Sequence, residues 1–333
     1  MPVHRLPKLP QLLDRKIYKT GQTRGADDDV IFQNRVGRSS TVLIPYACWE
    51  LCATPQGGEG EYENGFIVLL APSDYFGNPN ITADLAAKGL ALGTNALVFY
   101  ETREDWVANN PDSLRWKPAK RRTNPLGGRY VARIPATTAT VNGGRIVRGF
   151  DATSRKGAGI RVYEYASNAT TAKCRLQLEA LFWLCADSDK VAVSNGMTPE
   201  NIATRKSSTL AQCKEAGLLD AARMTKARIL NARGKTICPL CLEELSGQGF
   251  FNRMEQAEGR LVHDLTITQL NLFHVAELRF GVLNHRPYNV GWGHHHCNVV
   301  VKDSGILETL EWMRQVLNRN IQEGHLPTEN KAS

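Results

Sequence analysis

The segment GWGHHHCNVVVKD, residues 291–303, places three histidines and a cysteine in four consecutive positions. Imidazole nitrogen and thiolate sulfur are ligands that Zn²⁺ prefers, and a structural zinc takes four ligands in a tetrahedron. A second pair lies upstream in TICPLCLEE, residues 236–244. The combined spacing CxxC…HxxC predicts a structural zinc site, whose ligands are Cys238, Cys241, His294 and Cys297. His294 is chosen from the three histidines because it repeats the two-residue spacing before the cysteine.

The segment between the two ligand pairs is 52 residues long, and a compact zinc knuckle has roughly 15–20 there. Six of the eight histidines of the chain fall between positions 263 and 296. Histidine changes its charge near neutral pH, so such clustering indicates metal binding or acid–base chemistry. We therefore expect a folded insert whose candidate functional residues are His274, Asn289 and, directly after the last thiolate, Asn298.

These residues resemble the motif of the HNH, or ββα-metal, endonucleases in their zinc-bearing form. His274 and Asn289 are fifteen positions apart, Asn289 precedes Cys297 by eight, and Asn298 follows Cys297 directly, as in that family. The resemblance covers residues 235–305, about a fifth of the chain. It implies two strands and a helix around a catalytic divalent cation, with the zinc in a structural role.

The resemblance also implies a role for each residue in phosphodiester hydrolysis. That reaction needs a base that activates water and a divalent cation that binds the scissile phosphate. His274 would be the general base, Asn289 would orient the loop and the base, and Asn298 would bind the cation. A neutral imidazole suits a base near pH 7, and an amide oxygen suits Mg²⁺, for which Mn²⁺ is expected to substitute. Lys302 falls on a basic position that commonly follows in the family.

The sequence departs from the family at Phe273, the position before the base, where a metal-binding carboxylate is usual. A phenyl ring cannot ligate a cation, so either another group substitutes or the site is degenerate. Glu277 is the first candidate for this second Mg²⁺ ligand, and a solvated strand residue is the alternative interpretation. Asp264 and His295 are the next candidates. His263 and His285 are expected to be ordinary polar residues or contacts to DNA. For His295 and His296, contact with DNA phosphate, with the metal or with neither stays open.

Hydropathy patterns divide the chain into three regions and a tail. Residues 1–166 contain short β-branched and aromatic runs between turn residues, such as NGFIVLLAP, and these predict a mostly β region for DNA recognition. Residues 167–234 have helical spacing, with Thr198 before a proline as a helix start, and form a helical connector that contacts DNA. Residues 235–325 form the HNH nuclease module with its zinc knuckle and a closing helix, and residues 326–333 are a tail. The predicted fold class is α+β.

Basic residues are concentrated in one segment. The net charge is +8, whereas the segment from Arg115 to Arg161 alone contains twelve Lys or Arg against the single acid Asp151. Such an excess favours a polyanionic partner over an ordinary solvated surface, because phosphate contacts supply much of the affinity for DNA. The residues predicted to contact DNA are Lys117, Lys120, Arg121, Arg122, Arg129 and Lys302.

The other cysteines and the apolar runs indicate an intracellular protein, and the resemblance implies that it is prokaryotic and cytoplasmic. No apolar run approaches the ~18 residues of a membrane span, so no membrane partner is expected. The N-terminus has Pro and charges where a signal peptide needs an unbroken apolar block. Five cysteines outside the zinc motif are expected to be core residues: Cys48, Cys52, Cys174, Cys185 and Cys213.

The late position of the module, behind about 230 folded residues, favours a type II restriction endonuclease with a built-in sequence reader. Within that class the chain resembles the BstXI type. Such enzymes read palindromes, which implies a homodimer on double-stranded DNA, and a paired DNA methyltransferase is expected. The last helix offers apolar residues for a dimer interface or, equally, for core packing: Leu307, Leu310, Trp312, Met313 and Leu317.

Two other functions remain open. A modification-dependent nuclease would hold a methylated base, flipped out of the duplex, near NALVFYETREDW, residues 95–106, although aromatic strand residues are usually core. A non-catalytic, zinc-stabilised DNA-binding protein would explain Phe273. The joint presence of His274, Asn289 and Asn298 argues against this second alternative.

Overall fold

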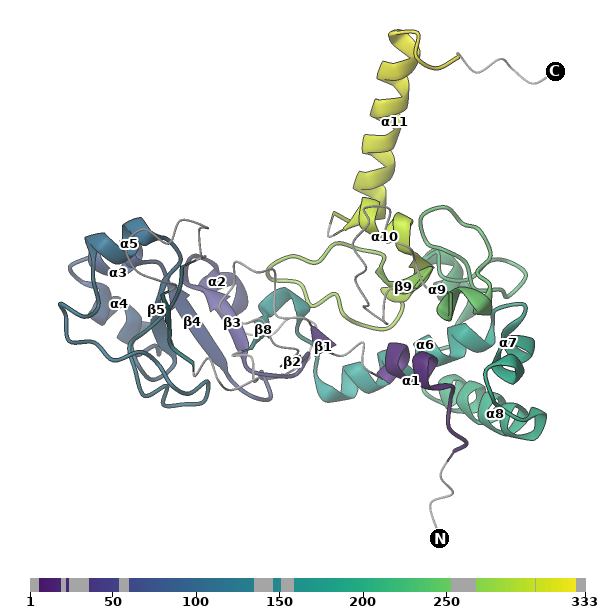
Figure 1. Ribbon diagram of the computed structural model, residues 1–333, viewed down its shortest axis with the longest axis horizontal. Helices are drawn as coiled ribbons and strands as arrows, with labels where there is room; N and C mark the ends of the chain where they lie inside the picture. Colours follow the sequence, from purple (N-terminus) through teal and green to yellow (C-terminus); the bar gives the residue numbers. More distant parts are fainter. Residues whose placement is uncertain are drawn as a thin grey trace. The chain divides into compact units, whose positions relative to one another are not determined.

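The computed structural model describes residues 6–18, 22–23, 36–53, 60–134, 146–150, 159–252, 268–302 and 304–327 (Figure 1). The chain divides into two compact units. The helical unit comprises Met1–Thr20, Ala172–Leu278 and Asn284–Ser333, and the sheet unit comprises Gly21–Thr171 and Arg279–Leu283. Most of the predicted connector and the first 20 residues therefore belong to the same unit as the C-terminal module, whereas the sequence patterns place them in separate regions.

The sheet unit is built on a six-stranded sheet with the strand order β7-β6-β5-β4-β3-β8. The five strands β6, β5, β4, β3 and β8 run parallel to their neighbours in this order. The edge strand β7 pairs antiparallel with β6. The strands are β3 Val42–Pro45, β4 Phe66–Leu70, β5 Ala96–Tyr100, β6 Tyr130–Arg133, β7 Val147–Arg148 and β8 Ile160–Arg161; β1 Gln22–Thr23 and β2 Val36–Gly37 pair separately. The connecting helices are η1 Tyr46–Cys48, α2 Trp49–Cys52, α3 Pro72–Phe76, α4 Ile81–Ala87, α5 Arg103–Ala108 and η2 Val162–Glu164.

Both faces of this sheet are buried. Ile44 and Val68 pack with Trp49 on one face, whereas Leu43 and Ile67 pack in a second cluster on the other. A strand that is covered on both sides needs an apolar residue at every position, which accounts for continuous runs such as FIVLL and ALVFY. The prediction of a mostly β region is therefore corrected: the sheet unit is α/β, because these runs are parallel strands with helices between them.

The helical unit encloses one large apolar core. Its helices are α1 Gln11–Tyr18, α6 Asn168–Trp183, α7 Ser188–Ser194, α8 Pro199–Glu215, α9 Ala221–Lys226, η3 Gly247–Phe250, α10 His295–Val301 and α11 Ile306–Gln322. The predicted start of α8 is confirmed, because the Thr198 side chain accepts a hydrogen bond from the Asn201 amide at 3.3 Å. Four of the five cysteines predicted as core residues are buried, and Cys48 is half-buried. Within the described ranges, no helix has the length and apolar content that crossing a membrane requires.

Two strands and a helix follow one another in the C-terminal part of this unit. Strand β9, Leu270–His274, pairs antiparallel with β10, Val290–His294, and α10 begins at the next residue (Figure 1). Phe273 points into the core and is fully buried. A Cβ atom at Gly293 would overlap its ring, so this close approach requires glycine. The β-β-α order expected for the C-terminal module is present.

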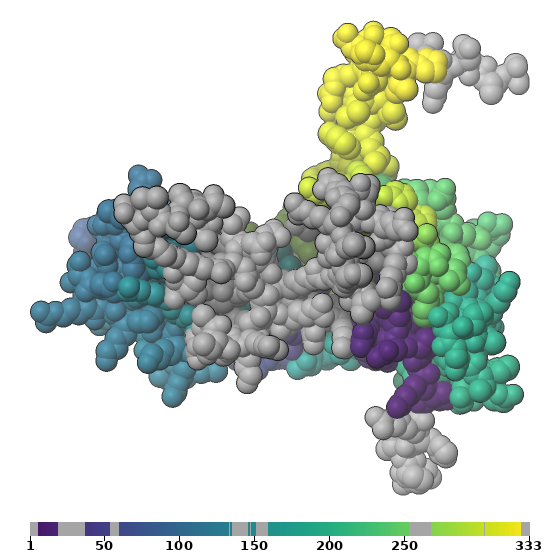
Figure 2. All heavy atoms as spheres, viewed as in Figure 1, coloured from purple at the N-terminus to yellow at the C-terminus, as the bar shows by residue number. Residues whose placement is uncertain are grey.

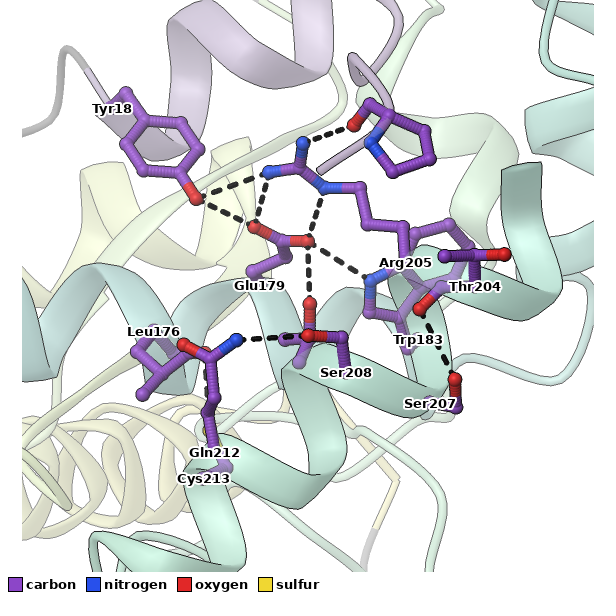
Figure 3. A network of polar contacts seen from close by, with 12 residues as sticks. Tyr18, Leu176, Glu179, Trp183, Thr204, Arg205, Ser207, Ser208, Gln212 and Cys213 are labelled. Atoms are coloured by element: carbon purple, nitrogen blue, oxygen red, sulfur yellow. Dashed lines mark hydrogen bonds and ion pairs between the residues drawn. The ribbon is translucent and has the colours of Figure 1, made fainter. Parts of the chain in front are cut away.

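A buried ion pair connects three helices of the helical unit (Figure 3). The Glu179 carboxylate of α6 accepts hydrogen bonds from Arg205 of α8 at 2.7 and 2.9 Å, from Tyr18 of α1 at 2.7 Å and from Thr209 at 2.9 Å. The side chains of Glu179 and Arg205 are only 1% and 8% exposed. Burial alone would raise the pKa of Glu179, but the hydrogen bonds and the charge of Arg205 outweigh it, and the pKa is lowered.

Replacing Glu179 with alanine is expected to lower the free energy of unfolding by about 3–5 kcal/mol, because Arg205 would remain buried without its partner. Urea unfolding at pH 7 measures this difference. The folded-state pKa of Glu179 lies below the unfolded value, so its contribution is complete above the unfolded pKa and is lost as the pH falls through the folded pKa. The difference between the two proteins should therefore shrink in acid.

The matched control for this prediction is Asp189→Asn, which breaks the exposed pair with Lys206. Its expected cost is below about 1 kcal/mol. A Glu179→Ala protein as stable as wild type would show that the buried pair does not stabilise the helical unit.

Helix α11 has its apolar residues divided between the core and the solvent. Leu310 and Met313 pack partly against the core of the helical unit. Leu307, Trp312 and Leu317 are 79%, 54% and 53% exposed. Figure 2 shows the atoms of α11, in yellow, standing clear of neighbouring atoms along much of the helix. One set of apolar residues on α11 therefore packs against the core, and another set forms an exposed apolar surface.

Candidate metal centre and nuclease site

The four predicted zinc ligands lie together in the helical unit. The ligand atoms of Cys238, Cys241, His294 and Cys297 are all within 4.8 Å of one another. Cys241 Sγ and His294 Nδ1 are 3.3 Å apart. Zinc–sulfur bonds of about 2.3 Å in a tetrahedron place the ligand atoms roughly 3.5–4 Å apart. The four side chains therefore fit a tetrahedral ion after only small rotations.

The three consecutive histidines have different surroundings. His294 directs Nδ1 at the thiol of Cys241, as the spacing predicts. His295 has its Nδ1 2.9 Å from Asn271 Nδ2, within β9. His296 is exposed and stacks on the ring of His294 at 5.3 Å. The geometry therefore favours His294 as the ligand.

Local backbone structure holds each ligand pair. Leu242 donates its amide to the carbonyl of Cys238, and Cys238 donates to the carbonyl of Glu243, both at 2.9 Å. Leu242 has a φ of 64°, which closes this tight turn. The second pair lies where β10 ends and α10 begins: His294 is the last strand residue, and Cys297 lies in the first helical turn. A turn and a strand–helix junction thus position the four ligands.

The thiols are packed closely enough to oppose ionisation. Burial, and then the neighbouring Cys238 and Cys241, raise the pKa of Cys297. Burial and Cys238 likewise raise the pKa of Cys241. Burial, and then His296, lower the pKa of His294, so its ring is neutral and able to ligate at pH 7. A divalent cation removes the repulsion because its charge stabilises the thiolates, and three sulfurs with one imidazole are typical of Zn²⁺.

His274 lies at the end of β9 and is half-buried. Its Nε2 is 3.0 Å from Nδ1 of His285, whose side chain is almost fully buried. Sequence analysis missed this pairing and placed His285 among ordinary polar residues. The clustering of histidines was the available signal, but an eleven-residue separation does not indicate which imidazoles meet.

The side chain of Asn289 spans the loop between β9 and β10. Its Oδ1 accepts a hydrogen bond from the Ala276 amide at 2.8 Å, and its Nδ2 donates to the carbonyl of Asn284 at 2.6 Å. Its own carbonyl accepts from the Val275 amide at 2.9 Å. Asn289 is only 6% exposed, so its side chain is largely shielded from water. The residues that directly follow His274 are therefore held in place by one amide.

The other predicted catalytic residues are less closely tied to this cluster. Asn298 is half-buried in α10, which packs against both strands, and no side-chain hydrogen bond of Asn298 occurs within the described ranges. Glu277 is half-buried three residues beyond His274. Phe273 is buried in the core, so its side chain does not take part in the candidate nuclease site. Lys302 is exposed at the end of α10. His263 and Asp264 lie outside the described residues.

The predicted DNA-binding residues of the sheet unit lie on the connection between α5 and β6. Lys117, Lys120, Arg121 and Arg129 are exposed, and Arg122 is half-buried. The Arg129 guanidinium lies over the Trp116 ring at 5.8 Å, which restricts its motion. With the exposed Arg115, this connection presents five cationic side chains to solvent.

The helical unit therefore combines a Cys₃His cluster with a β-β-α element, and the sheet unit is α/β. The model of the BstXI restriction endonuclease family matches residues 15–295. The chain belongs to the BstXI restriction endonuclease family. The matched range includes His274, Asn289 and three of the four cluster residues.

A comparison with curated protein sequences found no match. Among solved structures, the chain is similar to one described as the crystal structure of a type II restriction endonuclease, with 16% identity and a TM-score of 0.26. The aligned part covers 47% of this chain and 57% of that chain, so the chain spans just over half of that relative.

Proposed function

We propose that this protein is a type II restriction endonuclease that cuts double-stranded DNA at specific sites through a ββα-metal, or HNH, site. The observation that carries the proposal is one β-β-α element that holds His274 and the loop-bracing Asn289, with the Cys₃His cluster at its strand–helix junction. Membership of the BstXI restriction endonuclease family supports the class of activity. An enzyme of this class acts in the cytoplasm beside a DNA methyltransferase that protects the host sequence.

In the proposed mechanism, His274 accepts a proton from the attacking water. A neutral imidazole at pH 7 can do this if its ring is held in one orientation. His285 supplies that orientation through its contact with Nε2 of His274. Asn289 fixes the backbone that follows the base. His285 and Asn289 therefore both help to position the imidazole of His274.

A bound Mg²⁺, or Mn²⁺ in its place, would stabilise the negative charge that develops on the phosphate. Asn298 is proposed to hold it, because an amide oxygen is a hard ligand. Glu277 is proposed as the second ligand in place of the carboxylate that Phe273 replaces. The exposed cations Lys117, Lys120, Arg121 and Arg129, with Arg122 and Lys302, are proposed to contact DNA phosphates.

The test of this proposal is incubation of the purified protein with unmethylated phage DNA, in Mg²⁺ and in EDTA, followed by electrophoresis. Discrete fragments that need Mg²⁺ support site-specific cleavage, and sequencing their ends gives the site and stagger. A smear contradicts site specificity. Cutting confined to methylated DNA indicates the modification-dependent alternative. Binding without any cleavage indicates a non-catalytic DNA-binding protein.

We infer that the enzyme reads a palindrome as a homodimer that pairs two copies of α11. The exposed Leu307, Trp312 and Leu317 provide an apolar surface. The helix carries Glu308 in its first turn and Arg319 in its last. An antiparallel, two-fold pairing places these opposite charges near each other, so the surface is complementary to itself.

Replacing Trp312 and Leu317 together with glutamate is expected to convert the dimer into a monomer, because four carboxylates would enter the interface. Size-exclusion chromatography with light scattering measures the mass. Val193→Glu, an equally exposed apolar position on α7, is the control and should leave the dimer intact. A dimer that survives the double substitution would exclude α11 as the interface.

A further inference from the structure

The sheet unit contains a cavity that the proposed cleavage chemistry does not use. Its volume is about 510 Å³, within the roughly 300–1,000 Å³ typical of small-molecule sites. The walls come from the last residues of four strands and from the segments that follow these strands. They include Pro45 to Ala47 at the end of β3, Leu69 to Pro72 at the end of β4, Phe99 and Glu101 at the end of β5, and Arg161 and Tyr163 at the end of β8. Every residue of the lining belongs to the sheet unit.

The location of the cavity follows from the topology of the sheet. Strands β3, β4, β5 and β8 are parallel, so their carboxyl ends lie at the same edge. The chain adds β4, β5 and β6 on one side of β3, and later adds β8 on the other side. In open parallel sheets, the crevice at such a change of direction is where ligands bind. The cavity is therefore at the position that this architecture leaves open for a ligand.

The lining combines aromatic rings with carboxylates. Tyr46, Phe99, Tyr163 and Phe280 contribute ring surface, and the rings of Tyr163 and Phe280 meet edge to face at 5.3 Å. Flat, polarisable walls of this kind suit a planar heteroaromatic ring. The cavity is mostly apolar, so such a ring would be largely desolvated on entry.

Three carboxylates lie in the lining, and two of them accept hydrogen bonds from neighbouring residues. Asp74 accepts a hydrogen bond from the Ala71 amide, and Asp105 accepts one from the Thr102 hydroxyl. Within the described ranges, Glu101 has no hydrogen-bond or ion-pair partner. Glu101 is exposed by its surface area, and partial desolvation of its carboxylate, and then the nearby Asp105, raise its pKa. A carboxylate in this setting gains most from a ligand that donates N–H groups to it.

We propose that this cavity binds a single amino-bearing nucleobase, cytosine, adenine or guanine, extruded from the DNA that the enzyme reads. The aromatic walls would enclose the base, and Glu101 would accept hydrogen bonds from its amino group. Three carboxylates against the single cation Arg161 disfavour a phosphate in the cavity. Thymine, which has no amino group, should bind most weakly. Extrusion of the base from DNA rests on the proposed function, whereas binding of a free base in the cavity does not.

The first arm of the test uses free nucleosides with the full-length protein. Isothermal titration should show binding of cytidine, adenosine or guanosine and at least tenfold weaker binding of thymidine. Glu101→Gln, which keeps the size of the side chain, should weaken the bound nucleoside about tenfold. Ala47→Trp, at an exposed position of the lining, should abolish binding by filling the cavity. The control is Glu104→Gln, an exposed carboxylate outside the lining, which should change nothing.

The second arm identifies the source of the base. Binding of labelled duplexes is measured by fluorescence anisotropy in EDTA, so that no strand is cut. A duplex with one bulged cytosine should bind at least fivefold more tightly than the same duplex with a bulged abasic site. Ala47→Trp should remove this preference and leave the affinity for a plain duplex unchanged. Circular dichroism melting checks that each variant folds. If Ala47→Trp does not fold, the loss of the preference for the bulged base is tested with Glu101→Gln instead.

The two arms overturn different parts of the proposal. Nucleoside binding without any preference for the bulged base would mean that the cavity takes a free nucleoside, and extrusion would be wrong. No nucleoside binding and no bulge preference would overturn the site altogether. A protein that cuts DNA but shows neither effect retains the proposed nuclease function and loses only the pocket. A protein with both effects and no cleavage retains the pocket and loses the nuclease.

Discussion

Alanine in place of His274 is expected to slow DNA cleavage by about 10²–10⁴-fold, the range that positioned acid–base groups contribute. DNA affinity and the melting temperature should hardly change. The imidazole is half-buried at the end of β9, and its removal leaves the zinc cluster and the backbone braced by Asn289 in place. Single-turnover cleavage in Mg²⁺, with DNA binding measured in EDTA, separates the two effects.

Two further variants make this prediction specific. His325→Ala removes an exposed imidazole just beyond α11 and should cut at the wild-type rate. His285→Gln keeps a hydrogen-bonding group next to His274 but removes its titration, so it should change the pH profile of cleavage as well as the rate. Unchanged cleavage by His274→Ala would remove the proposed base, and an unchanged pH profile in His285→Gln would reduce His285 to a packing role.

Alanine in place of Cys238 is expected to remove the bound zinc and to unfold much of the helical unit. Structural zinc contributes about 10–16 kcal/mol of apparent binding free energy, which exceeds or matches the whole stability of an ordinary domain. Cys238 is fully buried in the core and is itself one of the four residues of the Cys₃His cluster, so its loss affects packing and ligation together. Metal analysis should fall from one zinc per chain to none, and the calorimetric transition should broaden or disappear.

The control for this prediction is Cys48→Ala, a half-buried cysteine of the sheet unit that is outside the cluster. It should retain the zinc and lose no more than about 1–2 kcal/mol. Chelation of the metal from wild-type protein should reproduce the unfolding of the Cys238 variant. A Cys238→Ala protein that is stable and free of zinc would show that the cluster does not support the fold.

The members of the Cys₃His cluster were readable from the sequence because each pair has a short spacing. Two residues between Cys238 and Cys241, and two between His294 and Cys297, are enough to specify a tight turn and a helix start. The β-β-α order was implied by the resemblance to the HNH endonucleases, whose motif spans both strands. The N-cap of α8 at Thr198 is similarly local. Each ligand pair and the N-cap depend on residues within a few positions of one another, whereas the two pairs are separated by 52 residues.

The sheet unit was misread because short apolar runs do not record strand direction. FIVLL and ALVFY fit an antiparallel sandwich as well as a parallel sheet, and only the helices packed on both faces distinguish them. The cavity at the strand ends has the same origin. Its lining joins Tyr46, Glu101, Tyr163 and Phe280, which are brought together by strand order and not by spacing.

By itself, the sequence determined the two short-spaced pairs of the Cys₃His set and the helical character of α6, α8 and α11, because local spacing and periodicity encode these features. The resemblance to the HNH endonucleases implied the β-β-α order. Only the tertiary structure decided that His285 contacts His274, that Phe273 is buried in the core, and that the strands of the sheet unit run parallel. The physical reason is that a contact between residues far apart in the chain depends on how whole elements pack. That packing follows from the burial of many side chains at once, and no single motif records it.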